Sequence, residues 1–180
     1  MSFYQKLAEI GPRFFSKATI LKYAFNLSPM YRRTTARVTY VSDDLLTIKI
    51  KIPLNYKNKN YVGSIFGGSM FSAVDPMPMV QLLNILDNQY IAWDKSAEIF
   101  FKIPAKESLY AEFTYTETEV EEIKKSVEEK GEIVIIKNTN LVDFENNKIF
   151  CEVKKKIYIA SKEHYKRKMQ ARKNIASIKD

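Results

Sequence analysis

The stretch that decides the fold is residues 60–75, which read NYVGSIFGGSMFSAVD. It places a glycine pair, Gly67 and Gly68, at the start of a long apolar helix, with one carboxylate, Asp75, about two turns further along. Paired glycines let a ligand approach the backbone closely, and the free N–H groups of a helix start can hold a negative charge. We therefore expect a ligand site at this helix start, with Asp75 as the acid that acts on the ligand.

The helix that begins there continues well beyond Asp75. Apolar residues fall on nearly every side of a helical projection over residues 66–86, and a helix that is apolar all round is buried. Pro76 and Pro78 lie inside this stretch, where each removes an N–H donor and disfavours helical geometry in the residue before it. We predict a buried central helix with a kink at Asp75.

Six strand-like segments surround this helix in the sequence, two before it and four after it. Alternating or β-branched apolar residues mark them, and they cover residues 35–41, 46–52, 95–103, 109–115, 133–142 and 149–159. Two short helices are expected in residues 3–27, and a charged helix over residues 119–130 ends at Gly131. An antiparallel sheet of about six strands has one apolar face that the central helix can cover, so we predict an α+β fold.

The 180 residues are enough for one structural domain with a hydrophobic core. We divide this domain into a helical segment at residues 1–34, a body at residues 35–160 and a basic tail at residues 161–180. The edges of the predicted sheet remain open, and an open edge favours pairing with a second copy of the chain. We therefore expect a homo-oligomer, either a dimer or a dimer of dimers.

The single histidine and the single cysteine limit the possible chemistry. A Ser-His-Asp site, a Cys-His site or a multi-histidine metal site would each need His164, which lies in a polar, basic stretch where we expect a solvent-exposed side chain. Carboxylates, hydroxyls, backbone groups or lysines must then carry any reaction, and we expect no metal and no redox cofactor. Cys151 alone cannot form an intramolecular disulfide.

The net charge of +8 is concentrated at the C-terminal end, because residues 154–180 hold ten Lys or Arg and only two acids. Such a tail can contact nucleic acid, an acidic membrane surface or phosphate groups, or it can form a solubilising helix. The sequence contains no nucleic-acid recognition motif, so we rank nucleic acid last among the possible partners of the tail. No apolar run reaches the roughly 18 residues of a membrane span, and residues 1–10 lack a signal-peptide pattern. We expect a cytoplasmic protein.

Taken with the order of the elements, residues 60–75 resemble the hot-dog superfamily, in which a curved antiparallel sheet wraps a long central helix. The spacing is similar to that of phenylacetyl-CoA-type and 4-hydroxybenzoyl-CoA-type thioesterases, which carry Asn or Gln, then His-Gly-Gly six residues later, and an acid nine residues after that histidine. The matching positions are Asn60, Phe66, Gly67, Gly68 and Asp75. Phe66 stands at the position of the histidine. In this respect the chain resembles an uncharacterised branch of the superfamily, whose members often lack that histidine.

The resemblance implies hydrolysis of an acyl-CoA or acyl-carrier thioester, with coenzyme A present only as part of the substrate. The N–H groups of Gly67 and Gly68 would polarise the thioester carbonyl, Asp75 would act as general base or nucleophile, and Asn60 would orient a reactant. Each assignment has a structural alternative. The glycines can serve close packing, Asp75 can bind backbone or a partner protomer at the kink, and Asn60 can shape a loop.

The remaining candidates would bind the substrate. Phe66, Met70 and Met79 would line an acyl pocket, although methionines in such a helix also pack in cores. Lys102 and Lys106, with Lys95 and the run 154–156, would contact the phosphates of coenzyme A or would simply lie on solvated strand faces and turns. Because Phe66 occupies a polar position of the motif, a non-catalytic module that binds an acyl-CoA or a lipid stays open as the alternative.

Overall fold

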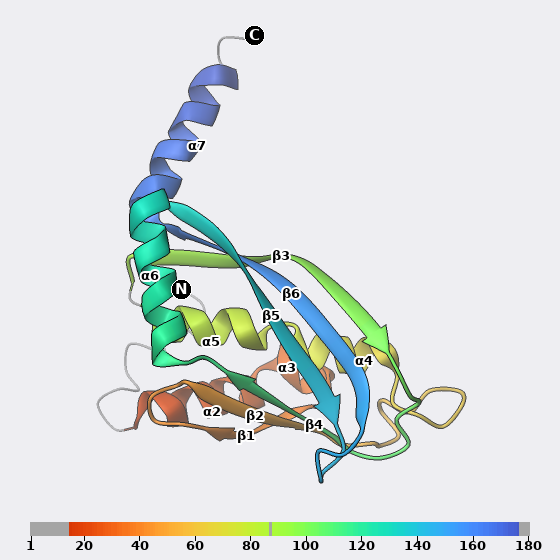
Figure 1. Ribbon diagram of the computed structural model, residues 1–180. Helices are drawn as coiled ribbons and strands as arrows, with labels where there is room; N and C mark the ends of the chain where they lie inside the picture. The colour runs from red at the N-terminus through yellow and green to blue at the C-terminus, as the bar shows by residue number, and fades with distance from the viewer. Residues whose placement is uncertain (1–14, 87, 177–180) are drawn as a thin grey trace.

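The computed structural model describes residues 15–86 and 88–176, and its centre is a curved six-stranded antiparallel sheet (Figure 1). The order across the sheet is β1-β2-β4-β5-β6-β3. The strands are β1 Arg37–Val41, β2 Thr47–Ile52, β3 Tyr90–Phe101, β4 Leu109–Thr114, β5 Glu132–Val142 and β6 Ile149–Ser161. The helices are α2 Lys17–Leu27, α3 Pro29–Arg33, α4 Gly67–Val74, α5 Met77–Ile85, α6 Glu117–Lys130 and α7 Lys162–Ala176.

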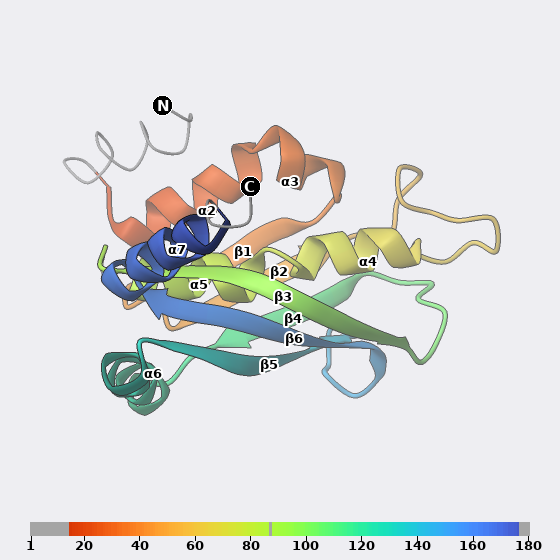
Figure 2. The ribbon, with the colours of Figure 1, turned by 90° about the horizontal axis from the view of Figure 1, so that it is seen from above.

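Helices α4 and α5 form the central helix around which the sheet curves (Figure 2). This arrangement confirms the predicted α+β hot-dog fold. The helix is interrupted where the prolines predicted a kink, since Asp75 ends α4 and Pro76, which has no N–H, precedes α5. Inward side chains of the sheet pack against both halves, and the largest apolar ones that are fully buried are Ile48, Ile50, Ile52, Leu109, Leu141, Ile157 and Ile159.

The N-terminal helices tie one edge of the sheet to the central helix. The Asn26 side chain on α2 donates to the Val38 carbonyl at 2.8 Å and accepts from the Val38 N–H at 2.9 Å, so it occupies the free edge of β1. On α3 the buried Tyr31 donates its hydroxyl to the Ala73 carbonyl at 3.1 Å. Residues 1–14, where part of this helical region was predicted, lie outside the described residues.

The opposite edge of the sheet is open. Within the described residues, β3 pairs with β6 on one side and has no strand on its other side. Unpaired backbone groups along a strand edge can template pairing with another chain. The two edges of this sheet therefore differ, since α2 covers one and leaves the other available.

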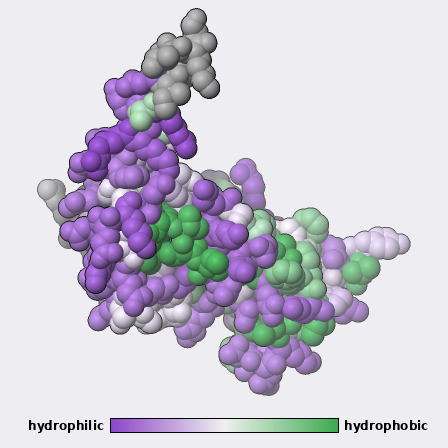
Figure 3. All heavy atoms as spheres, turned by 45° about the horizontal axis from the view of Figure 1, so that its top comes forward, coloured by the Kyte–Doolittle hydropathy of each residue, from purple (hydrophilic) through white to green (hydrophobic). Residues whose placement is uncertain are grey.

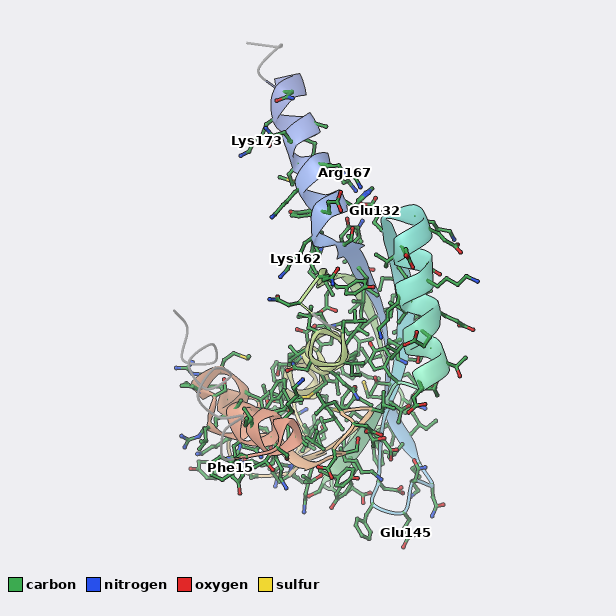
Figure 4. All side chains as sticks on the ribbon, turned by 90° about the vertical axis from the view of Figure 1, so that its left-hand side faces the viewer. Phe15, Glu132, Glu145, Lys162, Arg167 and Lys173 are labelled. Atoms are coloured by element: carbon green, nitrogen blue, oxygen red, sulfur yellow. The ribbon has the colours of Figure 1, made fainter. Side chains whose placement is uncertain are left out.

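The basic tail forms helix α7, which projects from the body and is covered by hydrophilic atoms (Figures 1 and 3). Its first turns are anchored to Glu132, which binds Lys168 Nζ at 2.5 Å and lies 3.4 Å from His164 Nε2 (Figure 4). The His164 side chain is 30% exposed, so it is only partly solvated. Among the described residues, no helix is both long and apolar enough to cross a membrane.

Candidate functional site

The start of α4 presents two unused backbone donors. Phe66 is the N-cap residue and makes no side-chain capping bond, and its carbonyl accepts the N–H groups of Ser69 at 2.9 Å and Met70 at 3.2 Å. Within the described part of the chain, the N–H groups of Gly67 and Gly68 have no hydrogen-bond acceptor. Both donors are therefore available to an oxygen of a ligand.

Aromatic rings explain why both positions are glycine. A Cβ atom on Gly67 would lie 2.8 Å from the ring of Phe101, and one on Gly68 would overlap the ring of Phe66. The rings are 58% exposed for Phe66 and 54% for Phe101, so they cover the helix start without being part of the core. The close-packing interpretation of the glycines is supported, and their N–H groups remain unpaired beside these rings.

The predicted acid lies at the other end of α4. One carboxylate oxygen of Asp75, Oδ1, is 2.8 Å from Lys155 Nζ, and the same ammonium donates to the backbone carbonyl of Asp75. A cation is favourable at this place, because the carbonyls of a helix C-terminus carry partial negative charge. Lys155 therefore fixes the side chain of Asp75 and also caps the break between α4 and α5.

Lys155 reaches Asp75 from the inward face of β6, and only 2% of its side chain is exposed. Its ammonium also binds Asp94 Oδ2 of β3 at 2.6 Å. A buried cation is tolerated only when it is paired, and here two carboxylates share one ammonium. The three side chains form a cluster with a net charge of −1 when both acids are ionised.

Asp94 is the less satisfied of the two acids. Its second oxygen, Oδ1, is buried and has no hydrogen-bond partner among the described residues. Burial raises the pKa of the Asp94 carboxyl, the hydrogen bond from Lys155 opposes that shift, and the charge of Asp75 adds to it. Asp94 is therefore the member of the cluster that takes up a proton more readily than an ordinary aspartate.

The roles of Lys155 and Asp94 were not predicted from the sequence. The run of lysines at residues 154–156 was expected to contact phosphates or to lie on a solvated face, and the burial of Lys155 overturns that interpretation for this residue. A signal was present in the sequence. Val153, Lys155 and Ile157 stand at every second position of β6 and so share one face, and the two residues that flank Lys155 on that face are apolar. A lysine at an inward position of a strand requires an acid nearby.

The Asn60 side chain shapes the loop before α4. Its Oδ1 accepts the Ser64 N–H at 3.0 Å and the Val62 N–H at 3.1 Å, and its Nδ2 donates to Ser64 Oγ at 2.9 Å. Gly63 has a φ of 80° within this tight turn. These contacts match the loop-forming alternative, and a role for Asn60 in orienting a reactant stays a prediction.

The predicted substrate-binding residues do not form one group, because Met70 and Met79 lie in different apolar clusters. Met70 is buried in the core beside β2 and β4, and Met79 is half-buried in a second cluster with Leu82. Lys102 is 2.9 Å from Glu152 Oε2, whereas Lys106 is exposed in the loop after β3. The methionines thus pack as core residues here, and substrate contacts of these residues stay predictions.

Other reactive groups contribute little to this region. The Cys151 thiol is buried, and burial raises its pKa to about 11, which disfavours the thiolate that a nucleophile needs. No group of His, Cys, Asp or Glu side chains in residues 15–86 and 88–176 is arranged to hold a metal ion.

The two halves of the predicted site lie at opposite ends of one helix. Gly67 and Asp75 are eight residues apart, which is about 12 Å at the rise of an α-helix. A base acts on the reacting atoms within hydrogen-bond reach, either directly or through one water. The donors and the acid of a single chain are thus well separated along α4, and a site that uses both of them stays a prediction.

Solved structures with this fold include thioesterases. A Pseudomonas aeruginosa protein described as of unknown function and a probable thioesterase has a TM-score of 0.71 and 16% identity, covering 79% of this chain and 95% of that chain. A Haemophilus influenzae thioesterase has a TM-score of 0.59 and 10% identity, covering 81% and 91%. A Staphylococcus aureus thioesterase has a TM-score of 0.54 and 11% identity, covering 74% and 99%. At these identities the likeness shows the fold.

Family membership comes from the sequence itself. No curated protein matches the chain. One family model, described as "Domain of unknown function (DUF4442)", matches residues 13–158. Since this match spans well over half of the 180 residues, the chain belongs to the DUF4442 family.

Proposed function

We propose that the protein is a hot-dog thioesterase that hydrolyses an acyl-CoA or acyl-carrier thioester. The observation that carries the proposal is the state of Asp75, because buried Lys155 fixes one carboxylate oxygen while 45% of the side chain stays exposed. A general base or nucleophile must be both oriented and reachable in this way. The thioesterases among the structural neighbours support the same reaction, and the motif spacing supports a likeness to the phenylacetyl-CoA-type and 4-hydroxybenzoyl-CoA-type enzymes.

The course of β3 indicates how a complete site can form. Strand β3 runs beside α4 in the opposite direction, since Phe101 at its end lies against Gly67. Asp94, seven residues earlier, is joined through Lys155 to Asp75 at the far end of α4. Both ends of α4 are therefore linked to β3, the strand at the open edge, the first through the ring of Phe101 and the second through Lys155 of β6.

Two copies that pair through this edge would bring the separated groups together. In a two-fold antiparallel pairing centred near residues 97–98, Asp94 of one copy lies opposite Phe101 of the other. Asp75 of the first copy then faces the Gly67 N–H of the second, and the gap of about 12 Å along the helix no longer matters. We propose such a homodimer, with two sites that each use both copies.

Each group then has a defined task in the hydrolysis. The N–H groups of Gly67 and Gly68 hold the thioester carbonyl oxygen and stabilise the negative charge that develops on it. Asp75 of the other copy removes a proton from a water whose oxygen attacks the carbonyl carbon, or it attacks that carbon directly. The C–S bond breaks when the tetrahedral intermediate collapses, and in the general-base route the leaving thiolate takes up the proton that Asp75 removed from the water. After direct attack the acyl group remains on Asp75 as an anhydride, and a water then hydrolyses it, which releases the carboxylic acid, restores Asp75 and supplies the proton for the thiolate.

A non-catalytic acyl-CoA-binding or lipid-binding module is the second candidate. The observation that favours it is the apolar, 58% exposed ring of Phe66 at the position where similar enzymes carry a histidine. A binding module would take up acyl-CoA without releasing a thiol. Its ligands would raise the melting temperature of the protein by mass action.

Thiol release from short, long and aromatic acyl-CoAs tests the proposal. We expect Asp75→Asn to lower turnover by about 10²–10⁴-fold, the usual contribution of a general base. Asp43→Asn is the matched control, because Asp43 is an exposed turn residue outside α4. Full turnover by Asp75→Asn would remove Asp75 from the mechanism. A wild type that releases no thiol but is stabilised by acyl-CoA would instead establish the binding module.

A further inference from the structure

Four basic side chains surround a pair of adjoining cavities between α3, β1 and the loop after β2. The cavities measure about 300 Å³ and about 460 Å³, and Arg32, Thr35, Arg37 and Lys57 line both of them. Arg33 lines the larger cavity. No acidic residue lines either cavity, so the charges on this surface have a single sign.

These cations lack the carboxylate partners that other lysines of the chain have. Lys49, Lys102, Lys137, Lys155 and Lys168 each form an ion pair with an acid. Within residues 15–86 and 88–176, none of the four cavity cations does so. Guanidinium groups present a planar fork of donors that matches the oxygens of a phosphate. The cavity thus offers an unneutralised and chemically suitable site for phosphate groups.

The wall of the cavity is fixed by hydrogen bonds that are buried or partly buried. Thr35 has a φ of 69°, a left-handed conformation that β-branched residues rarely adopt. Its Oγ1 accepts a 2.7 Å hydrogen bond from Asn58 Nδ2, which also donates to the Pro53 carbonyl at 2.8 Å. The Arg37 guanidinium is oriented by a 2.8 Å bond to the Ala36 carbonyl. The basic side chains therefore project from a defined backbone.

The same asparagine connects the cavity to the start of α4. The Asn58 carbonyl accepts the N–H of Phe66 at 2.7 Å, and Phe66 directly precedes Gly67. The cavity wall and the proposed carbonyl-binding donors are thus joined through one buried residue. A ligand with phosphates at one end and a thioester at the other would suit this arrangement.

We propose that the cavity lined by Arg32, Arg33, Arg37 and Lys57 binds the phosphate groups at the nucleotide end of a coenzyme A thioester. The identity of this ligand rests on the proposed thioesterase function. Tyr56 lines the smaller cavity with 86% of its surface exposed, and it offers a ring face for the adenine. Because a carrier-bound phosphopantetheine lacks the nucleotide and its 3′-phosphate, this site favours acyl-CoA over acyl-carrier substrates.

Calorimetric titration with coenzyme A, dephospho-coenzyme A, adenosine 3′,5′-bisphosphate and inorganic phosphate tests the site. The variant Arg32→Gln/Arg37→Gln is compared with Arg172→Gln/Lys173→Gln, which removes two charges from the exposed part of α7. We expect the cavity variant to bind coenzyme A and the bisphosphate at least about tenfold more weakly, because charge-assisted hydrogen bonds are lost. We expect no change in the α7 variant and weaker wild-type binding of dephospho-coenzyme A.

Three results would overturn the proposal. These are wild-type affinity in the cavity variant, an equal loss in the α7 variant, and binding of inorganic phosphate as tight as that of coenzyme A. Unchanged melting temperatures show that the variants are folded, and the single variant Lys57→Gln repeats the test with a smaller change. All of these readouts measure binding, so they remain decisive even if the protein releases no thiol.

If thiol is released, kinetics provide a second, independent readout. The cavity variant should raise KM for acyl-CoA and leave kcat unchanged, because the phosphates bind equally in the ground and transition states. Acyl-pantetheine, which lacks the nucleotide, should be hydrolysed equally well by wild type and variant. An equal loss with acyl-pantetheine would contradict a nucleotide site.

Discussion

Lys155 determines the position and the electrostatic surroundings of the acid at the end of α4. Its buried ammonium binds Asp75 and Asp94 at 2.8 Å and 2.6 Å. In Lys155→Met the two carboxylates would face each other without a cation. We expect the free energy of unfolding to fall by about 3–5 kcal/mol, the usual cost of breaking a buried ion pair. Urea denaturation measures this loss, and thiol release should disappear with it.

The neighbouring lysine is the control for that prediction. Lys156 is exposed on the other face of β6, and Lys156→Met should change stability by no more than about 0.5 kcal/mol. Combining Lys155→Met with Asp94→Asn removes one carboxylate together with the ammonium, so part of the lost stability should return. Wild-type stability in Lys155→Met alone would show that the bridge is not needed.

At the scale of residues, the sequence predicted part of the candidate site. The glycine pair and Asp75 lie at the two ends of α4, as their spacing predicted, because helix geometry follows from local sequence. Lys155 is 80 residues from Asp75, and the curvature of the sheet brings them together. Spacing along the chain carries no information about that curvature. The inward position of Lys155 was visible in the alternation along β6, but its pairing with Asp75 and Asp94 was not.

At the scale of elements, Glu132 links helix α7 to the sheet. Glu132 of β5 binds Lys168 Nζ and accepts the Tyr158 hydroxyl at 2.5 Å. The hydrogen bond from Lys168 is the main reason that the pKa of Glu132 falls from 4.5 to about 2, and the Tyr158 hydroxyl adds to it. A carboxylate with a lowered pKa stabilises the folded protein above its ordinary pKa. That contribution is lost as the pH falls from about 4.5 toward 2.

The single tryptophan can report on this contact. Trp93 lies 4.2 Å from the ring of Tyr158 on β6 and 5.4 Å from the ring of Tyr165 on α7. We expect Glu132→Gln to loosen α7 and shift the Trp93 emission to longer wavelength at neutral pH. The wild type should show the same shift only on acidification through that pH range.

Glu163, an exposed acid on α7 itself, provides the control for Glu132→Gln. Glu163 pairs weakly with Arg167 at 3.8 Å, and 81% of its side chain is exposed. Glu163→Gln should therefore leave the Trp93 emission unchanged at every pH. If Glu132→Gln had the same emission as the wild type, another contact would hold α7 in place.

The sequence predicted which strands and helices are present better than it predicted the residues at which they begin and end. Alternating apolar residues identified all six strands, and the prolines marked the break between α4 and α5. The predicted start of β3 was wrong, because the strand begins at Tyr90 whereas the prediction placed its start at residue 95. A register shift between Asp94 and Ser96 explains the difference. A bulge there interrupts the two-residue period on which the prediction relied.

For the whole molecule, the two edges of the sheet decide how copies can assemble. Asn26 occupies the β1 edge, whereas the β3 edge is free within the described residues and carries exposed Phe100 and Phe101. Pairing through β3 would extend the sheet and cover these rings. Light scattering should therefore give a mass of twice 21.0 kDa, or a multiple of that dimer. A monomer that still released thiol would contradict the shared site.

Mixing two inactive variants tests whether each site uses both copies. Asp75→Asn removes the acid, and Gly67→Pro removes one donor at the first helix position, where Phe66 already has an extended backbone and the exposed ring of Phe101 must move aside for the new side chain. After unfolding and refolding together, half of the dimers would be mixed, and each mixed dimer would keep one intact site of two. Turnover should return to about a quarter of the wild-type value. If acid and donor belonged to the same chain, every site would stay defective and the mixture would remain inactive.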